Sequence, residues 1–453
     1  MSGAPGEGDG NLGPLRAAWR AGRGPAVRAL LDRDERVFLR QVLSTPCLEA
    51  VVGAEGPWLL GADGARILDF HGNSVHQLGH GHPAVVAAVV ETLRTLPFCP
   101  RRYTNPSAVR LAERLVAALP GGLGAWKCLL APSGSVAVGI ALKLARYATG
   151  RPGVVAFEGS FHGAGLDAAS VSGEPLFRDG LGPLLPGVRF LPPPTRGACR
   201  FGCRDTAHTG CTEALEELLA RSPDVGALIA EPVRWTTVEL PPEGYWQRVR
   251  AICDRFGVLL ILDEIPSALA RTGRLFAHEP FAVVPDVLVL GKGLGGGVWP
   301  QAAVLARAEL DRVPEKAIGH YTHEKSPAGA AAALATLEVI EREDLCGRAR
   351  RLGAHLVARL ETLRDRHPAI AAVRGIGLML GVELRLADGR PAATLADRVL
   401  YASLARGLSF KIGAGHVLTL CPPITIGEAE LDAAVAILDA ALAEAAAAEG
   451  LRS

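Results

Sequence analysis

The sequence predicts an α/β protein with a mainly parallel sheet, followed by a smaller α+β domain. From about residue 126 to 310, apolar β-branched runs alternate with helical stretches rich in alanine and leucine. This alternation is typical of βαβ units, in which each helix connects two parallel strands. After about residue 343 the pattern changes to one long helix, short strands and a closing helix, which indicates a second domain.

The expected strands of the first region each end in a polar or glycine-rich turn. They are KCLLAPS (127–133), GVVAFEG (153–159), GALIAEPV (226–233), GVLLILDEI (257–265), DVLVLGKG (286–293) and AAVLARA (302–308). In the C-terminal region we expect a helix over 345–367 and strands over 377–385 and 416–423. The sequence therefore predicts a large domain over 96–343 and a small domain that includes 344–453.

Composition favours an intracellular enzyme that acts on a small molecule. Lys and Arg (48) nearly balance Asp and Glu (47), so we expect neither nucleic acid nor a membrane surface as a partner. The first dozen residues are glycine-rich and acidic, unlike a signal peptide, and no apolar run approaches the roughly 20 residues that span a bilayer. Nine cysteines in a chain of 453 residues suggest reduced thiols, and therefore a cytoplasmic location.

Polar and aromatic residues gather where the expected strands end. Open α/β sheets bind ligands at the carboxyl ends of their strands, so these residues predict one active site. The residues concerned are Ser133, Phe161, His162, Glu231, Asp263 and Lys292.

Asp263 and Lys292 suggest a specific chemistry. Asp263 closes a strand that should be buried, where a carboxylate is costly unless a partner offsets its charge. It either makes a structural cap or ion pair, or meets a cationic ring nitrogen. Lys292 lies between a β-branched strand and a run of glycines, where a desolvated amine readily forms a Schiff base.

Two further segments complete this chemistry. Ser133, Gly134 and Ser135 precede an amphipathic helix, whose free amides can bind an anion, although a simple serine cap explains the same pattern. Phe161 and His162 lie in a glycine-rich turn that offers an aromatic face to a planar ring. A phosphate loop, a ring platform, a carboxylate and a Schiff-base lysine together predict pyridoxal 5'-phosphate (PLP).

The chain resembles the class III aminotransferases, which are fold-type-I PLP enzymes, from about residue 45 to 440. The motifs that carry this resemblance are GARILDFHGNSVHQLGHGHPAV (64–85), SGSVAVGIALKLAR (133–146), IAEPV (229–233), LDEIPSALARTG (262–273), PDVLVLGKGLGGG (285–297), VRGIGLMLGVEL (373–384) and CPPITI (421–426). The resemblance implies a seven-stranded sheet flanked by helices. It also implies a small domain built from the C-terminal segment together with residues 1–95, and a homodimer with shared active sites.

The resemblance also implies roles for single residues. Lys292 would form the Schiff base and Asp263 would pair with the pyridine nitrogen. Ile265 and Phe161 would enclose the ring, with His162 and Glu231 among the cofactor contacts. Ser133, Gly134 and Ser135 would hold the phosphate, and Thr322 would reach the phosphate in the neighbouring subunit.

Departures from the family pattern bear on the reaction. Val136, Pro266 and the run HEK (323–325) stand where the family usually has other residues. Thr419 stands where many members that bind an α-carboxylate carry arginine, and threonine cannot offer a guanidinium fork. These differences disfavour an ordinary amino-acid substrate.

Arg101 and Arg102 offer a different cation for the substrate, although they also fit a solvated surface pair. Two arginines suit a phosphate or phosphonate. The segments LSTPCL (43–48), RRYTN (101–105), DEIP (263–266), GHYTHEKSP (319–327) and GLSFK (407–411) resemble the branch of the family that contains the (R)-1-hydroxy-2-aminoethylphosphonate ammonia-lyases. This resemblance favours an ammonia-lyase, with a transaminase that uses pyruvate or 2-oxoglutarate as the alternative. A binding protein that only keeps the fold is disfavoured, because Lys292 and Asp263 are both present.

One cluster belongs to none of these readings. Cys199, Cys203, His208 and Cys211 are spaced in the manner of a zinc site with three cysteines and one histidine, though more tightly than usual. The sequence thus predicts either a structural zinc or a loop of free thiols on an insertion in the large domain.

Overall fold

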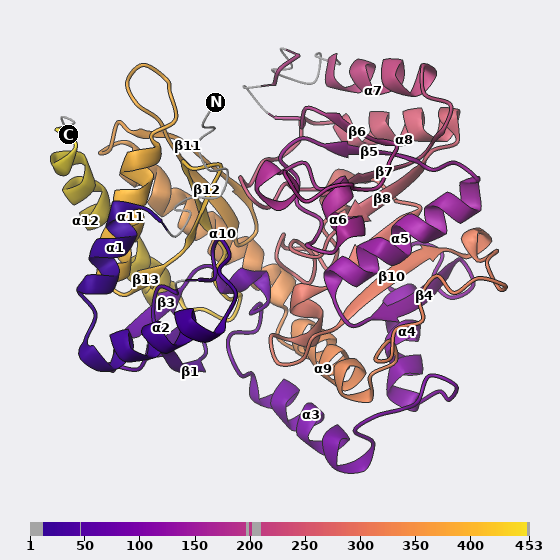
Figure 1. Cartoon of the computed structure of the whole chain (residues 1–453), viewed down its shortest axis with the longest axis horizontal. Helices are drawn as coiled ribbons and strands as arrows, with labels where there is room; N and C mark the ends of the chain where they lie inside the picture. Colours follow the sequence, from indigo (N-terminus) through magenta and orange to yellow (C-terminus); the bar gives the residue numbers. More distant parts are fainter. Residues whose placement is uncertain (1–11, 46, 196–198, 202–209, 451–453) are drawn as a thin grey trace.

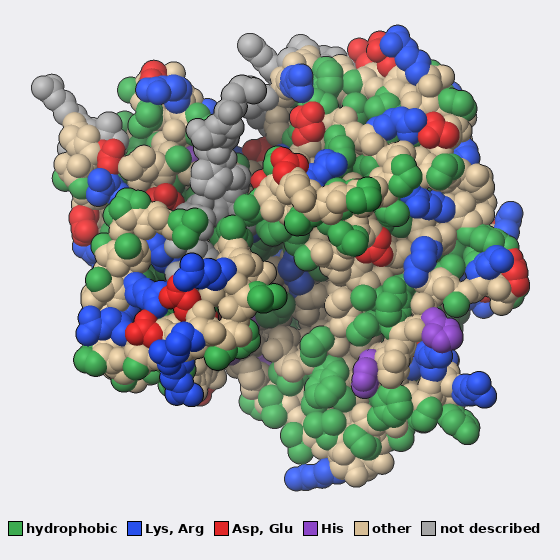
Figure 2. Space-filling view, in the orientation of Figure 1, with side chains coloured by type: hydrophobic (Ala, Val, Ile, Leu, Met, Phe, Trp, Pro, Cys, Tyr) green, Lys and Arg blue, Asp and Glu red, His purple; other side chains and the backbone are tan. Residues whose placement is uncertain are grey.

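The computed structural model describes residues 12–450, apart from residue 46 and the segments 196–198 and 202–209. The chain forms two lobes, and the surface is recessed between them (Figures 1 and 2). Within the described residues, no helix combines the length and the apolar character that crossing a membrane requires.

The larger lobe is built on a seven-stranded sheet, and the predicted fold class is confirmed. Five neighbouring strands run parallel, and β10 is antiparallel to both of its neighbours. In spatial order the strands are β4 (Trp126–Ala131), β10 (Ala302–Arg307), β9 (Val287–Leu290), β8 (Leu259–Asp263), β7 (Val225–Ala230), β5 (Gly153–Phe157) and β6 (Val188–Leu191). The sequence analysis missed β6, a short edge strand beside β5.

Alternate residues of the central strands enter two separate hydrophobic clusters. Val154, Ile261 and Val289 pack with α5 on one face, whereas Leu228 and Leu262 pack with the helices of the other face. This alternation is expected for strands that are covered on both sides. The helices are α5 (Gly134–Thr149) on the first face, and α4 (Pro106–Ala117), α7 (Gly210–Ala220), α8 (Tyr245–Phe256) and α9 (Pro327–Arg342) on the second. The short helix α6 (Leu166–Val171) follows β5 and also packs in the first cluster.

The smaller lobe contains two four-stranded sheets. The first has the order β1 (Val51–Glu55), β2 (Trp58–Gly61), β3 (Arg66–Asp69) and β13 (Leu408–Ser409). The second has the order β11 (Ile370–Ile376), β12 (Met379–Leu384), β15 (Val417–Leu420) and β14 (Lys411–Gly413). Because β13 pairs with β3, the first sheet joins the C-terminal part of the chain to the N-terminal part.

Helices cover these sheets. They are α1 (Pro14–Ala21), α2 (Pro25–Val37), α10 (Leu345–Arg364), α11 (Ala393–Ala405) and α12 (Glu428–Ala448). The rings of Trp19 in α1 and Tyr401 in α11 lie 6.1 Å apart, a second link between the two ends of the chain. Helix α3 (Pro83–Thr95) instead packs against α9 of the larger lobe. The domain division at residues 95 and 343 therefore stays a proposal.

Candidate active site

The carboxyl ends of the central strands meet at one edge of the sheet. Asp263 is the last residue of β8. Glu231 follows β7 directly, and Lys292 follows β9 after one residue. Ser133 follows β4, which runs in the same direction as β9 because both are antiparallel to β10. The sheet thus brings residues that are far apart in sequence to one side of the molecule.

His162 and Asp263 form the buried centre of this edge. Nδ1 of His162 lies 2.7 Å from Oδ2 of Asp263, and both residues are at most 2% exposed. Oδ1 of Asp263 accepts the backbone N–H of Ile265 at 3.0 Å, so both carboxylate oxygens have a donor. The Nε2 atom of His162 is buried and has no hydrogen-bond partner among the described residues. A carboxylate held in this way keeps lone pairs for the N–H of a cationic ring.

Glu231 is a buried carboxyl group that keeps its proton up to about neutral pH. Its Oε1 atom accepts the backbone N–H of Trp235 at 3.2 Å. The pKa of Glu231 is raised to about 7, chiefly by burial; His162 opposes this shift and the charge of Asp263 adds to it. Desolvation has this direction for any carboxyl group because it disfavours the charged form.

The loop before α5 lies beside Lys292. Ser133 is the N-cap of α5, and its side chain accepts the N–H of Val136 at 3.4 Å. A cavity of about 340 Å³ is lined by Ser133, Gly134 and Lys292 together with residues 297–301. A Cβ atom on Gly134 would stand 2.8 Å from Cδ1 of Ile265, so glycine lets the helix terminus approach Ile265 closely.

Ser135 connects this loop to the turn after β5. Its Oγ atom accepts the backbone N–H of Ala164 at 2.9 Å, and a Cβ on Gly163 would collide with it. Phe161, in the same turn, packs its ring 4.4 Å from that of Phe177. The phosphate loop and the aromatic turn predicted from the sequence are therefore neighbours in space.

Lys292 has a strained backbone and faces an indole ring. Its φ angle of 43° lies in the left-handed region, which costs a residue with a side chain roughly 1–3 kcal/mol. Its Nζ atom lies 5.2 Å from the ring centre of Trp235, a residue that is 7% exposed. Such strain is common at functional sites, where the surrounding structure holds the residue in place.

These residues fit PLP. An amine beside a helix N-terminus, a buried carboxylate with free lone pairs and a glycine-lined cavity are the groups that the cofactor requires. Lys292 would bind its aldehyde carbon, Asp263 its ring nitrogen, and Ser133, Gly134 and Ser135 its phosphate. These roles remain proposals.

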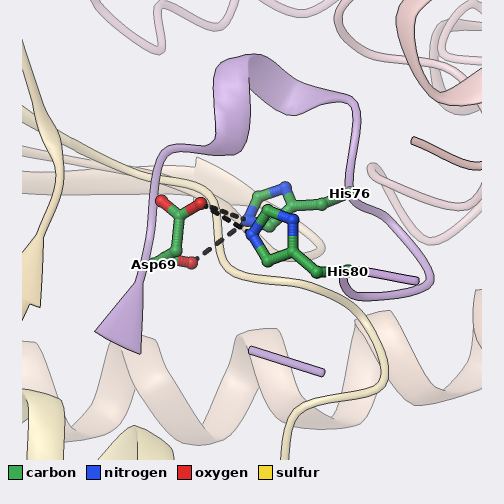
Figure 3. A group of neighbouring side chains, drawn as sticks. All are labelled: Asp69, His76 and His80. Atoms are coloured by element: carbon green, nitrogen blue, oxygen red, sulfur yellow. Dashed lines mark hydrogen bonds and ion pairs between the residues drawn. The ribbon is translucent and has the colours of Figure 1, made fainter. Parts of the chain in front are cut away.

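Asp69, His76 and His80 form a further group, with ligand atoms within 4.8 Å of one another (Figure 3). Nε2 of His80 lies 3.0 Å from Oδ2 of Asp69, and Nε2 of His76 lies 3.1 Å from the Asp69 carbonyl oxygen. The backbone amides of His71 and Gly72 donate to Oδ1 of Asp69 at 2.9 Å. Hydrogen bonds therefore account for this group, which fixes the turn that carries His71.

This network also explains the acidity of its members. Burial opposes the ionisation of Asp69, but the hydrogen bonds from His80 and the backbone and the nearby His76 hold its pKa well below the usual range. Burial lowers the pKa of His76 to about 4, although Asp69 opposes this shift. Burial therefore favours the neutral form of His76 within this hydrogen-bonded group.

Arg101 contacts the segment that carries Thr322. Nη2 of Arg101 is 2.7 Å from Nε2 of His320, and the hydroxyl of Tyr321 is 3.5 Å from Nζ of Lys143. Arg101 thus lies against the segment of Thr322, which the resemblance implies reaches the cofactor phosphate in the neighbouring subunit. The roles of Thr322, Arg101 and Arg102 stay predictions from the sequence.

The cysteine cluster lies partly outside the described residues. Cys203 and His208 fall in the segment 202–209, whereas Cys211 is buried at the start of α7 and Cys199 is half-buried. The structural zinc therefore stays a prediction from the sequence.

Sequence reasoning missed Trp235, His71 and Lys411. Trp235 follows Glu231 by four residues and was open to prediction from its place after a strand end. His71 and Lys411 lie inside segments that carry the resemblance, but no local pattern distinguishes them.

A mainly parallel sheet with a lysine, a carboxylate and a helix N-terminus at its carboxyl edge defines the class of PLP-dependent fold-type-I enzymes. The family model described as aminotransferase class-III matches residues 41–442, and the chain belongs to this family.

Several individual proteins resemble the chain over nearly its full length. It is 43% identical to an (R)-1-hydroxy-2-aminoethylphosphonate ammonia-lyase from Vibrio splendidus, over 97% of this chain and 95% of that protein. It is 37% identical to an acetylornithine aminotransferase from Methanopyrus kandleri, over 85% and 94%. A PLP-bound amine transaminase from an uncultivated Pseudomonas species superposes with a TM-score of 0.83 at 31% identity, over 90% and 98%.

Proposed function

We propose that this enzyme releases ammonia from 1-hydroxy-2-aminoethylphosphonate, or a closely similar amino alcohol, and gives an aldehyde. The observation that carries this proposal is the 43% identity, across 97% of the chain, to a protein named for that reaction. The geometry of Thr419 supports it. This residue is 1% exposed, and its hydroxyl donates to the carbonyl oxygen of Thr236 at 3.1 Å. Thr419 therefore offers no fork for an α-carboxylate.

When bound, PLP supplies an electron sink for negative charge that develops at the carbon next to the amine. Asp263 holds the N–H of the pyridine ring, and His162 keeps the Asp263 carboxylate oriented from its other side. Ser133, Gly134 and Ser135 hold the phosphate at the N-terminus of α5, where free amides and the helix dipole favour an anion.

Lys292 would act as the base toward the bound substrate. Its Nζ atom removes a proton from the carbon next to nitrogen, and the hydroxyl on the neighbouring carbon leaves as water. The released enamine then takes up one water and gives aldehyde and ammonia. One water leaves and one enters, so the balance is one ammonia and one aldehyde for each substrate molecule.

A transaminase is the alternative. It shares the first proton removal, but it passes the nitrogen to a keto acid such as pyruvate or 2-oxoglutarate. The observation that favours it is the likeness to solved amine transaminases and curated aminotransferases.

For either reaction, we propose that the chain forms a homodimer in the cytoplasm. In this dimer Thr322 and the arginine pair reach the active site of the neighbouring subunit.

The test is ammonia release by the purified, PLP-loaded chain from 1-hydroxy-2-aminoethylphosphonate, with no keto acid present. Sustained turnover with equal amounts of ammonia and aldehyde supports the lyase. Turnover that begins only after pyruvate or 2-oxoglutarate is added, together with a panel of amines, would contradict it.

A further inference from the structure

A second lysine lies on the same indole ring as Lys292. Nζ of Lys411 is 4.7 Å from the ring centre of Trp235, and Nζ of Lys292 is 5.2 Å from it. The three residues come from different parts of the chain: Trp235 follows β7, Lys292 follows β9, and Lys411 begins β14. The fold therefore places two amines around one aromatic surface at the active site.

The packing of β14 fixes the position of Lys411. A Cβ atom on Gly413 would stand only 1.6 Å from the carbonyl oxygen of Thr236, so glycine lets β14 lie against the segment that carries Trp235. Lys411 pairs with Thr419 across antiparallel strands, and the Thr419 hydroxyl donates to the same Thr236 carbonyl. Residues opposite each other in such a pair share one face of the sheet.

His71 adds a hydrogen-bonding group to this surface. Its ring centre is 5.8 Å from that of Trp235. Burial, followed by the charge of Lys411 and with a smaller effect from Lys292, lowers the pKa of His71 to about 3. Its Nε2 atom is shielded from solvent and has no hydrogen-bond partner within the described part of the chain. A neutral imidazole with an unused ring nitrogen can donate one hydrogen bond to an anion.

We propose that Lys411 and His71 bind the phosphonate group of the substrate, whose amino group reacts at Lys292. This inference rests on the proposed function, and it adds two side chains to the arginine pair proposed for the phosphonate. A two-carbon amine spans roughly 5 Å from its nitrogen to a phosphonate oxygen. The Nζ atoms of Lys292 and Lys411 both lie within 5.2 Å of one indole centre, so a short substrate bound at this ring has both amines nearby. The Lys411 ammonium neutralises the dianion and His71 donates to a phosphonate oxygen.

The experiment measures binding separately from turnover. Equilibrium dialysis with the PLP-loaded full chain gives the affinity for 2-aminoethylphosphonate, which lacks the hydroxyl that leaves, and for propylamine, a neutral amine that has a methyl group in place of the phosphonate and also lacks this hydroxyl. The variants are Lys411→Met, Lys411→Arg and His71→Phe, and the control is Lys127→Met, which removes an exposed lysine from the edge strand β4. Cofactor content is measured for every variant.

We expect Lys411→Met to weaken aminophosphonate binding by about 10- to 100-fold, as for the loss of a charge-assisted hydrogen bond. Binding of the neutral amine, cofactor content and the affinities of Lys127→Met stay at wild-type values. Lys411→Arg restores most of the affinity, and His71→Phe weakens aminophosphonate binding by about 3- to 10-fold.

Equal losses for both amines, or no loss for the aminophosphonate, would overturn the proposal. The wild-type chain alone gives a second test, because similar affinities for the two amines would also overturn it. Should the wild-type chain bind the aminophosphonate selectively through Lys411 yet release no ammonia from the hydroxylated substrate, the lyase proposal fails and the phosphonate site stands.

Discussion

Nδ1 of His162 lies 2.7 Å from Oδ2 of Asp263 inside a buried pair at the end of β8. The two residues are 101 positions apart, and only the parallel sheet brings them together. Because the second oxygen of Asp263 accepts the N–H of Ile265, this carboxylate has a fixed orientation. The pair therefore presents a defined acceptor, which we propose binds the ring nitrogen of the cofactor.

Replacing Asp263 with Asn tests this acceptor. We expect turnover to fall by about 10²- to 10³-fold, because an amide cannot stabilise a protonated pyridine nitrogen as a carboxylate does. Turnover and cofactor content are compared with those of Asp365→Asn, which changes an exposed aspartate at the end of α10. A fall as small as that of the control would remove Asp263 from the site.

Replacing Lys292 with Ala removes the amine that we propose attaches the cofactor. Borohydride reduction followed by peptide mass spectrometry should find the cofactor on Lys292 in the wild-type chain and on no lysine in the variant. Turnover should fall by at least about 10³-fold, since both the nucleophile and the base are lost. Unchanged turnover, or attachment at Lys411, would overturn the assignment.

Glu231 makes stability depend on pH in a defined direction. In the folded chain its pKa is about 7, compared with 4.5 for an ordinary glutamate, so the folded state holds the extra proton between these values. The free energy of unfolding should therefore fall as the pH rises through this window, by about 1–3 kcal/mol. Glu231→Gln should remove the fall, and the exposed control Glu243→Gln should keep it.

Urea unfolding of the cofactor-free chain at several pH values measures this effect. If the wild-type chain and Glu231→Gln lose stability equally as the pH rises, Glu231 is ionised in the folded state and the prediction is wrong.

The arginine pair provides a fourth prediction. Replacing Arg101 and Arg102 with Met should raise KM for the phosphonate substrate about tenfold and change that for a neutral amine by less than about twofold. The effect should require the dimer. Arg101 contacts His320 of the same chain, and this segment carries Thr322, which we propose reaches the neighbouring subunit's active site. The exposed control Arg390→Met should change neither KM value selectively. Equal changes in both KM values for the Arg101 and Arg102 variant would mean that the pair is a solvated surface pair and does not bind the phosphonate.

The sequence was sufficient for the central sheet because its strands are long apolar runs with polar ends. Asp263 and Lys292 were proposed as site residues for the same reason, because each follows or ends such a run. The strand β6 (Val188–Leu191) was missed because it is only four residues long and prolines follow it closely. Short edge strands carry little periodic signal.

The surroundings of Trp235 were beyond the reach of sequence patterns. His71 and Lys411 are 340 positions apart in the sequence, yet both side chains lie close to this ring. Their meeting depends on the pairing of β13 with β3 and on the contact between Gly413 and Thr236. These are long-range contacts, and no local spacing encodes them.

The fate of the substrate nitrogen tests the central claim most directly. The PLP-loaded chain is given 1-hydroxy-2-aminoethylphosphonate with an isotopically labelled amino nitrogen, in the presence of excess 2-oxoglutarate and pyruvate. The lyase account predicts that the label appears in free ammonia, in equal amount to the aldehyde, and is absent from glutamate and alanine. Label in either amino acid at the rate of aldehyde formation would contradict the account and define a transaminase.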